Sequence, residues 1–220
     1  IVQRSLSLRE MLVASKLMSR YMHFVITQKK NPIWIAQREG RAKDGNDRTQ
    51  EAVLKMIAMG GEGTATERLM AMHIVPLSIS YEFDPCDFLK AKEFQMKRDN
   101  PAYKKTRADD LVNMQTGLFG YKGRVHYACA PCIDDWIATR KGLSNAEFFA
   151  ATARRLDEEI YRNYRLYPNN FVALDLLNNE KDYISHYSEE DKVQFEQYLQ
   201  QQIDKIDLPN KDEAFLRERL

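Results

Sequence analysis

A cluster of charged residues around a glycine follows a short apolar segment in the first fifth of the chain. The segment is IWIA, residues 33–36, and the cluster contains Arg38, Glu39, Gly40 and Arg41. Arginine guanidinium groups match phosphate oxygens bidentately, and a glycine lets the backbone approach an oxyanion closely. Glu39 would orient an arginine or accept a hydrogen bond from a substrate hydroxyl. The cluster predicts an anion site, and a solvated turn is the alternative that spacing alone leaves open.

The overall composition requires any such anion site to be local. Net charge is only +1, so no global field favours nucleic acid, and we predict no nucleic-acid partner. Three cysteines without a signal-peptide pattern indicate a reducing compartment, and we expect a cytoplasmic location. The apolar segment 8–27 is interrupted by Arg9, Glu10, Lys16 and Arg20. It is therefore not a simple bilayer-spanning helix, but it could lie on a membrane.

Predicted strands and helices alternate along the first two thirds of the chain. Residues 1–3 resemble the end of a strand, Ser7 and Glu10 form a capping box for a helix over 8–28, and 33–36 has the continuous apolar pattern of a buried parallel strand. Further helices are predicted over 47–59, 66–73, 84–98 and 107–119, and further strands over 74–83 and 120–131. This alternation predicts right-handed crossovers and an α/β fold with a mainly parallel sheet flanked by helices.

The pattern changes after Gly142, where only helices are predicted. These helices cover 144–167, 169–177 and 188–206. We therefore predict an α/β body over 1–140 and an α-helical C-terminal region over 141–220. Tyr164, Tyr167 and Phe171 are expected to pack this region against the body, and an acyl-chain groove or a membrane interface is the alternative. Because the chain begins at Ile1 without a methionine, we expect it to be a fragment of a longer protein.

The predicted sheet would bring two arginine-bearing segments to one edge. Ligands of open parallel sheets bind at the carboxyl ends of the strands. Arg4 follows the first predicted strand, and the cluster at 38–41 follows the second. If these strands are neighbours, Arg4 and the cluster line one anion-binding mouth. A structural ion pair between Arg4 and Glu39 is the competing interpretation.

Three segments in this order resemble the sequence blocks of a known enzyme family. IVQRSLS, IWIAQREGRAKDG and IVPLSISYE resemble the second, third and fourth blocks of the glycerol-3-phosphate and lysophosphatidate acyltransferases. Arg4 matches the arginine of the second block, Glu39, Gly40 and Arg41 match the third, and Pro76 matches the proline of the fourth. GRVHYACAPCI also resembles the later Gly-x-Val strand, so the resemblance covers roughly residues 1–135. QREGRAK departs from the usual Glu-Gly-Thr-Arg-Ser, because it has no threonine and its arginine comes one position earlier.

The resemblance implies an enzyme of bacterial phospholipid biosynthesis. Such an acyltransferase moves a fatty acyl group from acyl-CoA or acyl carrier protein to a hydroxyl of glycerol 3-phosphate or lysophosphatidate. It needs no cofactor or metal beyond the acyl donor as co-substrate, and it is implied to be membrane-associated, peripheral at the inner face. The implied phosphate-binding residues are Arg4, Arg38, Glu39, Gly40 and Arg41, and Pro76 is the implied acyl-donor wall.

The family's catalytic His and Asp, five positions apart, precede the second block. We therefore expect this pair upstream of Ile1, assign no catalytic residue within the chain, and expect the fragment alone to be inactive. His186 and Asp191 have the same spacing, but Ser188 as a helix N-cap explains them sufficiently. His23, His73 and His126 are interpreted as structural.

Two other functions are weighed against acyl transfer. A non-catalytic phosphate-binding or interaction module would keep the anion site without the base. The motif CAPC resembles a thiol redox motif, in which case Cys129 would have a lowered pKa. Cys129, Cys132, Cys86 and His126 show no convincing zinc-ligand spacing, so no metal site is predicted.

Overall fold

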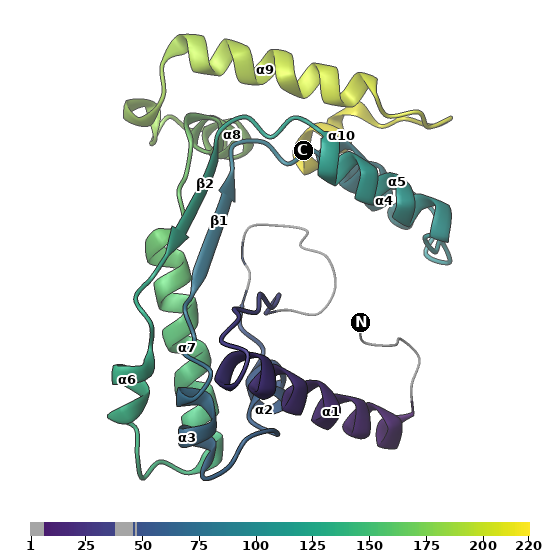
Figure 1. The fold of residues 1–220 in the computed structure, drawn as a ribbon. Helices are drawn as coiled ribbons and strands as arrows, with labels where there is room; N and C mark the ends of the chain where they lie inside the picture. The colour runs from purple at the N-terminus through teal and green to yellow at the C-terminus, as the bar shows by residue number, and fades with distance from the viewer. Residues whose placement is uncertain (1–6, 38–45, 47) are drawn as a thin grey trace. The chain divides into compact units, whose positions relative to one another are not determined.

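The computed structural model describes residues 7–37, 46 and 48–220 (Figure 1). The chain divides into two compact units. The first unit comprises Ile1–Ser78 with Tyr127–Tyr164, and the second comprises Ile79–His126 with Arg165–Leu220. Most of the described residues are helical, and each unit has buried residues of its own.

Helices build the described part of the first unit. They are α1 (Leu8–Thr27), α2 (Glu51–Ile57), α3 (Ala65–Met70), α6 (Asp134–Ala138) and α7 (Asn145–Asn163). Side chains from these helices form one apolar core, in which Leu69, Ile137 and Phe148 are almost wholly buried. Capping boxes begin α1, α3 and α7, because in each case a Ser or Thr is followed three residues later by a Glu.

Buried polar contacts join α1 to the end of α2. The Ser19 hydroxyl donates to the carbonyl of Ile57 at 2.6 Å and accepts the Gly60 N–H at 2.6 Å. The Nε2 atom of the buried His23 lies 3.1 Å from the same Ile57 carbonyl. The polar side chains buried at this junction therefore have partners, and the structural interpretation of His23 is confirmed.

The second unit is built from helices around smaller apolar clusters. The elements are α4 (Asp87–Asp99), α5 (Arg107–Phe119), α8 (Pro168–Asn178), the 3₁₀ helix η1 (Ile184–His186), α9 (Glu189–Asp204) and α10 (Glu213–Arg219). Ala91, Ile206 and Leu216 form one cluster, and Val172, Phe195 and Leu199 form another. The buried Glu93 carboxylate is paired with Lys97 and Lys105, which satisfies its charge.

Two strands, β1 (Leu77–Tyr81) and β2 (Val125–Cys129), pair as one antiparallel ribbon (Figure 1). The Ala130 N–H donates to the Pro76 carbonyl, and the Glu82 N–H donates to the Arg124 carbonyl, both at 2.9 Å. These pairings run in opposite directions along the two strands, which defines the antiparallel register. The chain passes from one unit to the other within both strands.

The prediction of a mainly parallel sheet flanked by helices is wrong. The described residues contain only the two antiparallel strands, and 33–36, predicted as a strand, has no strand structure. Ile33 and Ile35 instead pack onto the core of the first unit from an irregular segment. A short apolar run indicates that its side chains are buried but not that its backbone pairs with a strand, which explains the wrong prediction at 33–36. The predicted first strand, residues 1–3, lies outside the described residues.

The predicted helices are largely confirmed, including α1, α4, α5, α7, α8 and α9 within a few residues. The predicted division into 1–140 and 141–220 stays a prediction. Among the described residues, no helix is both long and apolar enough to cross a bilayer.

Candidate functional site

The predicted phosphate-binding residues lie outside the described part of the chain. These residues are Arg4, Arg38, Glu39, Gly40 and Arg41. Their grouping around one anion therefore stays a prediction. The structure does describe residues on either side of the cluster at 38–41.

The residues that flank the cluster are bonded to each other and to α7. The Gln37 carbonyl accepts the Gln50 N–H at 3.2 Å, and the Thr49 hydroxyl lies 3.1 Å from Gln37 Oε1. Asp157 Oδ1 accepts from both the N–H and the hydroxyl of Thr49, at 2.7 and 2.6 Å. Tyr161 also donates to Asn46 at 2.8 Å. The residues that flank the cluster on both sides are therefore joined to each other and to α7.

Pro76, the predicted wall of the acyl-donor site, is buried immediately before β1. Its carbonyl accepts the Ala130 N–H, so Pro76 joins the start of β1 to the residue that follows β2. The segments around Pro76 and Val125 are therefore paired neighbours. The role of Pro76 toward a donor stays a prediction.

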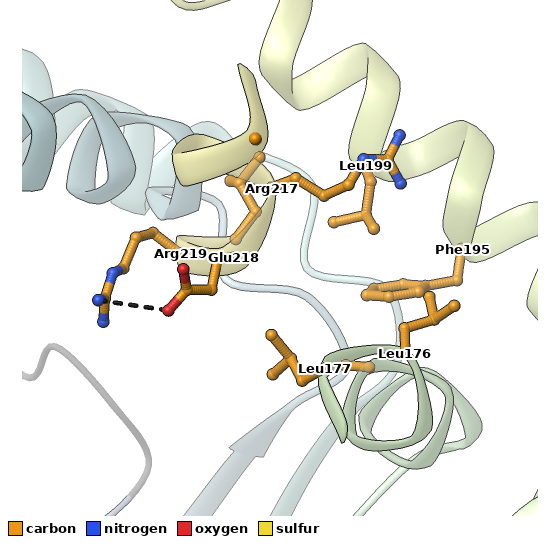
Figure 2. Close-up of a pocket in the computed structure, with 10 residues that line it drawn as sticks. Leu176, Leu177, Phe195, Leu199, Arg217, Glu218 and Arg219 are labelled. Carbon is orange, nitrogen blue, oxygen red and sulfur yellow. Dashed lines mark ion pairs between the residues drawn. The ribbon is translucent and has the colours of Figure 1, made fainter. Parts of the chain in front are cut away.

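An apolar pocket of about 480 Å³ lies in the second unit, between α8, α9 and α10. Leu176, Leu177, Phe195 and Leu199 form its apolar wall, and their side chains face one another in Figure 2. Arg217, Glu218 and Arg219 complete the lining, with Arg219 paired to Glu218 at 3.4 Å. A pocket of this size and polarity suits an apolar chain with a charged end. The sequence did not predict this pocket, because its lining comes from three helices that only the fold brings together.

Two of the three tail aromatics, Tyr167 and Phe171, pack within the second unit, whereas Tyr164 is the last residue of the first unit. Tyr167 is buried, and the Arg124 guanidinium lies 4.9 Å from its ring centroid. Phe171 stacks on the ring of His186 with centroids 4.4 Å apart. Tyr167 and Phe171 therefore serve packing, and neither lines the pocket.

His186 and Asp191 have separate local partners. Asp191 accepts hydrogen bonds from the Ser188 N–H at 2.8 Å and from its hydroxyl at 2.7 Å. These bonds hold the pKa of Asp191 below its usual value. The predicted N-cap at Ser188 is confirmed. The Asp191 carboxylate, whose spacing from His186 matched that of the family's catalytic pair, bonds to this N-cap instead.

A cluster of three potential ligands lies at the surface of the first unit. His73 follows α3, while Cys132 and Asp134 lie at the start of α6. His73 Nδ1 lies 2.6 Å from Asp134 Oδ2. Partial loss of solvation at the largely exposed thiol, together with the neighbouring Asp134 carboxylate, raises the pKa of Cys132. Redox-active thiols of the C-x-x-C type have lowered pKa values, so this environment gives no support to redox chemistry at Cys132.

Comparisons with known proteins give no relative for this chain. No protein-family model matches it, and searches of curated proteins and of solved structures each found no match.

Proposed function

We propose that the chain carries the acceptor-binding part of a glycerolipid O-acyltransferase. In the intact enzyme, an acyl group would pass from acyl-CoA or acyl carrier protein to a hydroxyl of glycerol 3-phosphate or lysophosphatidate. Arg4, Arg38 and Arg41 would bind the phosphate, with Glu39 and the backbone at Gly40 orienting it. The observation that carries the proposal is the order and spacing of the three sequence blocks that contain these residues.

The base of the charged segment adds structural support. Gln37 and Thr49 hold its two ends together, and Asp157 ties Thr49 to α7. Joining the two ends of a segment lowers the conformational entropy cost of binding a ligand along it. Arginines carried on such a segment are better suited to bind phosphate than arginines on a free tail.

The apolar pocket in the second unit supports the acyl part of the proposal. Its leucine and phenylalanine wall offers apolar contact, and Arg217 at its lining can meet a negative end. Fatty acyl chains carry this combination of a long apolar stem and a polar end. The proposed occupant of the pocket is therefore an acyl chain of a substrate or product.

Replacement of both Arg38 and Arg41 by alanine should weaken glycerol 3-phosphate binding at least tenfold, because each charge-assisted bond to phosphate is lost. Isothermal titration of glycerol 3-phosphate into the full 220-residue chain measures the effect. Arg9→Ala with Arg20→Ala is the matched control, since it removes the same charge from exposed positions on α1. Equal affinities in the wild type and in the Arg38/Arg41 variant would exclude this site.

The alternative, a phosphate-binding module without catalysis, shares this binding result. It is distinguished by turnover, which only the acyltransferase proposal requires. Binding without any acyl transfer by the natural polypeptide would favour the module.

Exposed apolar and cationic side chains on α1 support peripheral contact with an anionic membrane surface. Leu8, Leu12 and Leu17 are 75%, 56% and 67% exposed, and Lys16 and Arg20 are exposed on the same helix. Apolar side chains beside cations favour the interface of a bilayer that contains anionic lipid. The partner proposed for this helix is therefore a membrane surface.

The variant Leu12→Asp with Leu17→Asp should reduce binding to phosphatidylglycerol vesicles at least fivefold in a flotation assay. The added aspartate charges oppose insertion of these α1 positions into the bilayer interface. Leu111→Asp with Leu118→Asp is the control, since these exposed leucines lie on α5, whose first turn carries Asp109 and Asp110. Equal losses in both double variants, or no vesicle binding by the wild type, would reject the role of α1.

A further inference from the structure

Three side chains of different chemistry converge at one place on the first unit. One ligand atom each from His73, Cys132 and Asp134 lies within 4.8 Å of the other two. Imidazole nitrogen, thiolate sulfur and carboxylate oxygen are the three ligand types that bind Zn²⁺ in proteins. Hard cations such as Mg²⁺ and Ca²⁺ prefer all-oxygen ligands, so this donor set favours zinc.

The backbone holds the two ligand-bearing segments in fixed register. The Ile133 N–H, between Cys132 and Asp134 in the sequence, donates to the carbonyl of Ile74, the residue after His73, at 3.0 Å. Ala130 and Pro76 make the next bond along the same pair of segments. Beneath them Ile133 and Ile137 are buried in the core. The cluster is therefore arranged by the fold, and a bound ion would not need to create it.

The Asp134 carboxylate has unused bonding capacity. Its Oδ2 atom contacts His73 Nδ1, whereas its Oδ1 atom is buried and makes no hydrogen bond within the described part of the chain. A buried carboxylate oxygen without a partner carries an energetic penalty that a cation would relieve. The unpartnered oxygen belongs to the same carboxylate that contacts His73.

We propose that His73, Cys132 and Asp134 bind one Zn²⁺ ion. Tetrahedral zinc with bonds of about 2.0 to 2.3 Å places its ligand atoms ~3.3 to 3.8 Å apart. The His73–Asp134 contact of 2.6 Å must therefore lengthen by less than about 1 Å, and the exposed His73 side chain has the freedom to move. Binding displaces the thiol proton of Cys132 to solvent, and the thiolate becomes the ligand.

Three protein ligands leave the fourth position of a tetrahedral ion to water or to another ligand. The ion would join His73, in the segment after α3, to Cys132 and Asp134 at the start of α6, and these two helices already pack together. Sequence spacing gave no sign of this site, because His73 and the other two ligands are far apart in the chain and only the fold brings them together.

The test is metal binding by the full 220-residue chain, reduced and freed of metal, at neutral pH. Zinc should bind with a stoichiometry of one in a competition titration against a chromophoric chelator. Cobalt substituted for zinc should give thiolate-to-metal charge-transfer absorption in the near ultraviolet and tetrahedral visible bands. The cobalt spectrum reports the thiolate ligand in the unmutated protein, so it does not depend on any variant folding.

Cys132→Ser and Asp134→Asn should each weaken zinc binding at least tenfold, and Cys132→Ser should abolish the charge-transfer absorption. Cys129→Ser is the matched control, because Cys129 lies on the same segment but outside the cluster, and it should bind zinc like the wild type. Circular dichroism confirms that each variant is folded. Zinc binding absent from the wild type, lost equally in Cys129→Ser, or accompanied by a cobalt spectrum without thiolate charge transfer would overturn the proposal.

Discussion

Leu69→Ala should lower the free energy of unfolding of the first unit by about 3 to 4 kcal/mol. The Leu69 side chain is fully buried in α3 and belongs to the apolar core that α2, α6 and α7 share. Its truncation removes apolar surface from the core and leaves a cavity, because neighbouring helices relax only in part. Urea unfolding followed by circular dichroism measures the loss.

The matched control for Leu69 is the same substitution on an exposed helix position of the same unit. Leu17 on α1 is 67% exposed, so Leu17→Ala should change stability by less than about 0.5 kcal/mol. Similar losses in the two variants would show that the core of the first unit is not where the structure places it.

The second large effect is a pH dependence at Asp87, at the start of α4. Burial of its carboxylate raises its pKa to about 6, against an ordinary value of 3.8, although the Tyr198 hydroxyl donates to it. The folded state therefore holds a proton that the unfolded state has already released between about pH 4 and pH 6. Stability gained from this group at low pH is lost as the pH rises through that window.

Asp87→Asn removes this titration. The stability of the variant minus that of the wild type should rise by about 2 to 3 kcal/mol between pH 4 and pH 7. Urea unfolding of both proteins across this range gives the difference directly. Glu196→Gln, which removes an exposed carboxylate from α9, serves as the control. A difference for Asp87→Asn that stays flat with pH would contradict the buried, proton-holding carboxylate.

Local sequence signals predicted the helices because each signal acts over one turn. Ser7 with Glu10 and Ser188 with Asp191 cap their helices by bonds between residues three apart, and both caps form as the sequence indicated. The glycines after α2 likewise follow the end of that helix. Short-range hydrogen bonds and apolar periodicity suffice for such elements.

The sheet was not predictable in the same way. A strand satisfies its backbone only through a partner that can be distant in sequence, and apolar pattern does not name that partner. The apolar pattern of IWIA therefore resembles that of a buried strand. The strand β1 pairs instead with β2, which follows it in the chain after two helices. The antiparallel pairing of β1 with β2 depends on the tertiary structure, and the alternation of helices and strands along the sequence does not predict it.

Among the candidate sites, only the one made of consecutive residues could be predicted from the sequence. The cluster at 38–41 can be recognised in the sequence because its residues are consecutive, but these residues lie outside the described part of the chain. The His73–Asp134 contact has no sequence signature, since a histidine after α3 and an acid at the start of α6 have no fixed spacing. The pocket beside Leu199 likewise requires three helices to meet.

Acyl transfer by the natural polypeptide that contains these 220 residues tests the central claim most directly. The account predicts that radiolabelled acyl-CoA or acyl carrier protein, incubated with glycerol 3-phosphate or lysophosphatidate, yields the acylated product. It also predicts that the variant with Arg38→Ala and Arg41→Ala forms the product at least tenfold more slowly. No product from either donor with either acceptor, or a rate unaffected by the loss of both arginines, would contradict it.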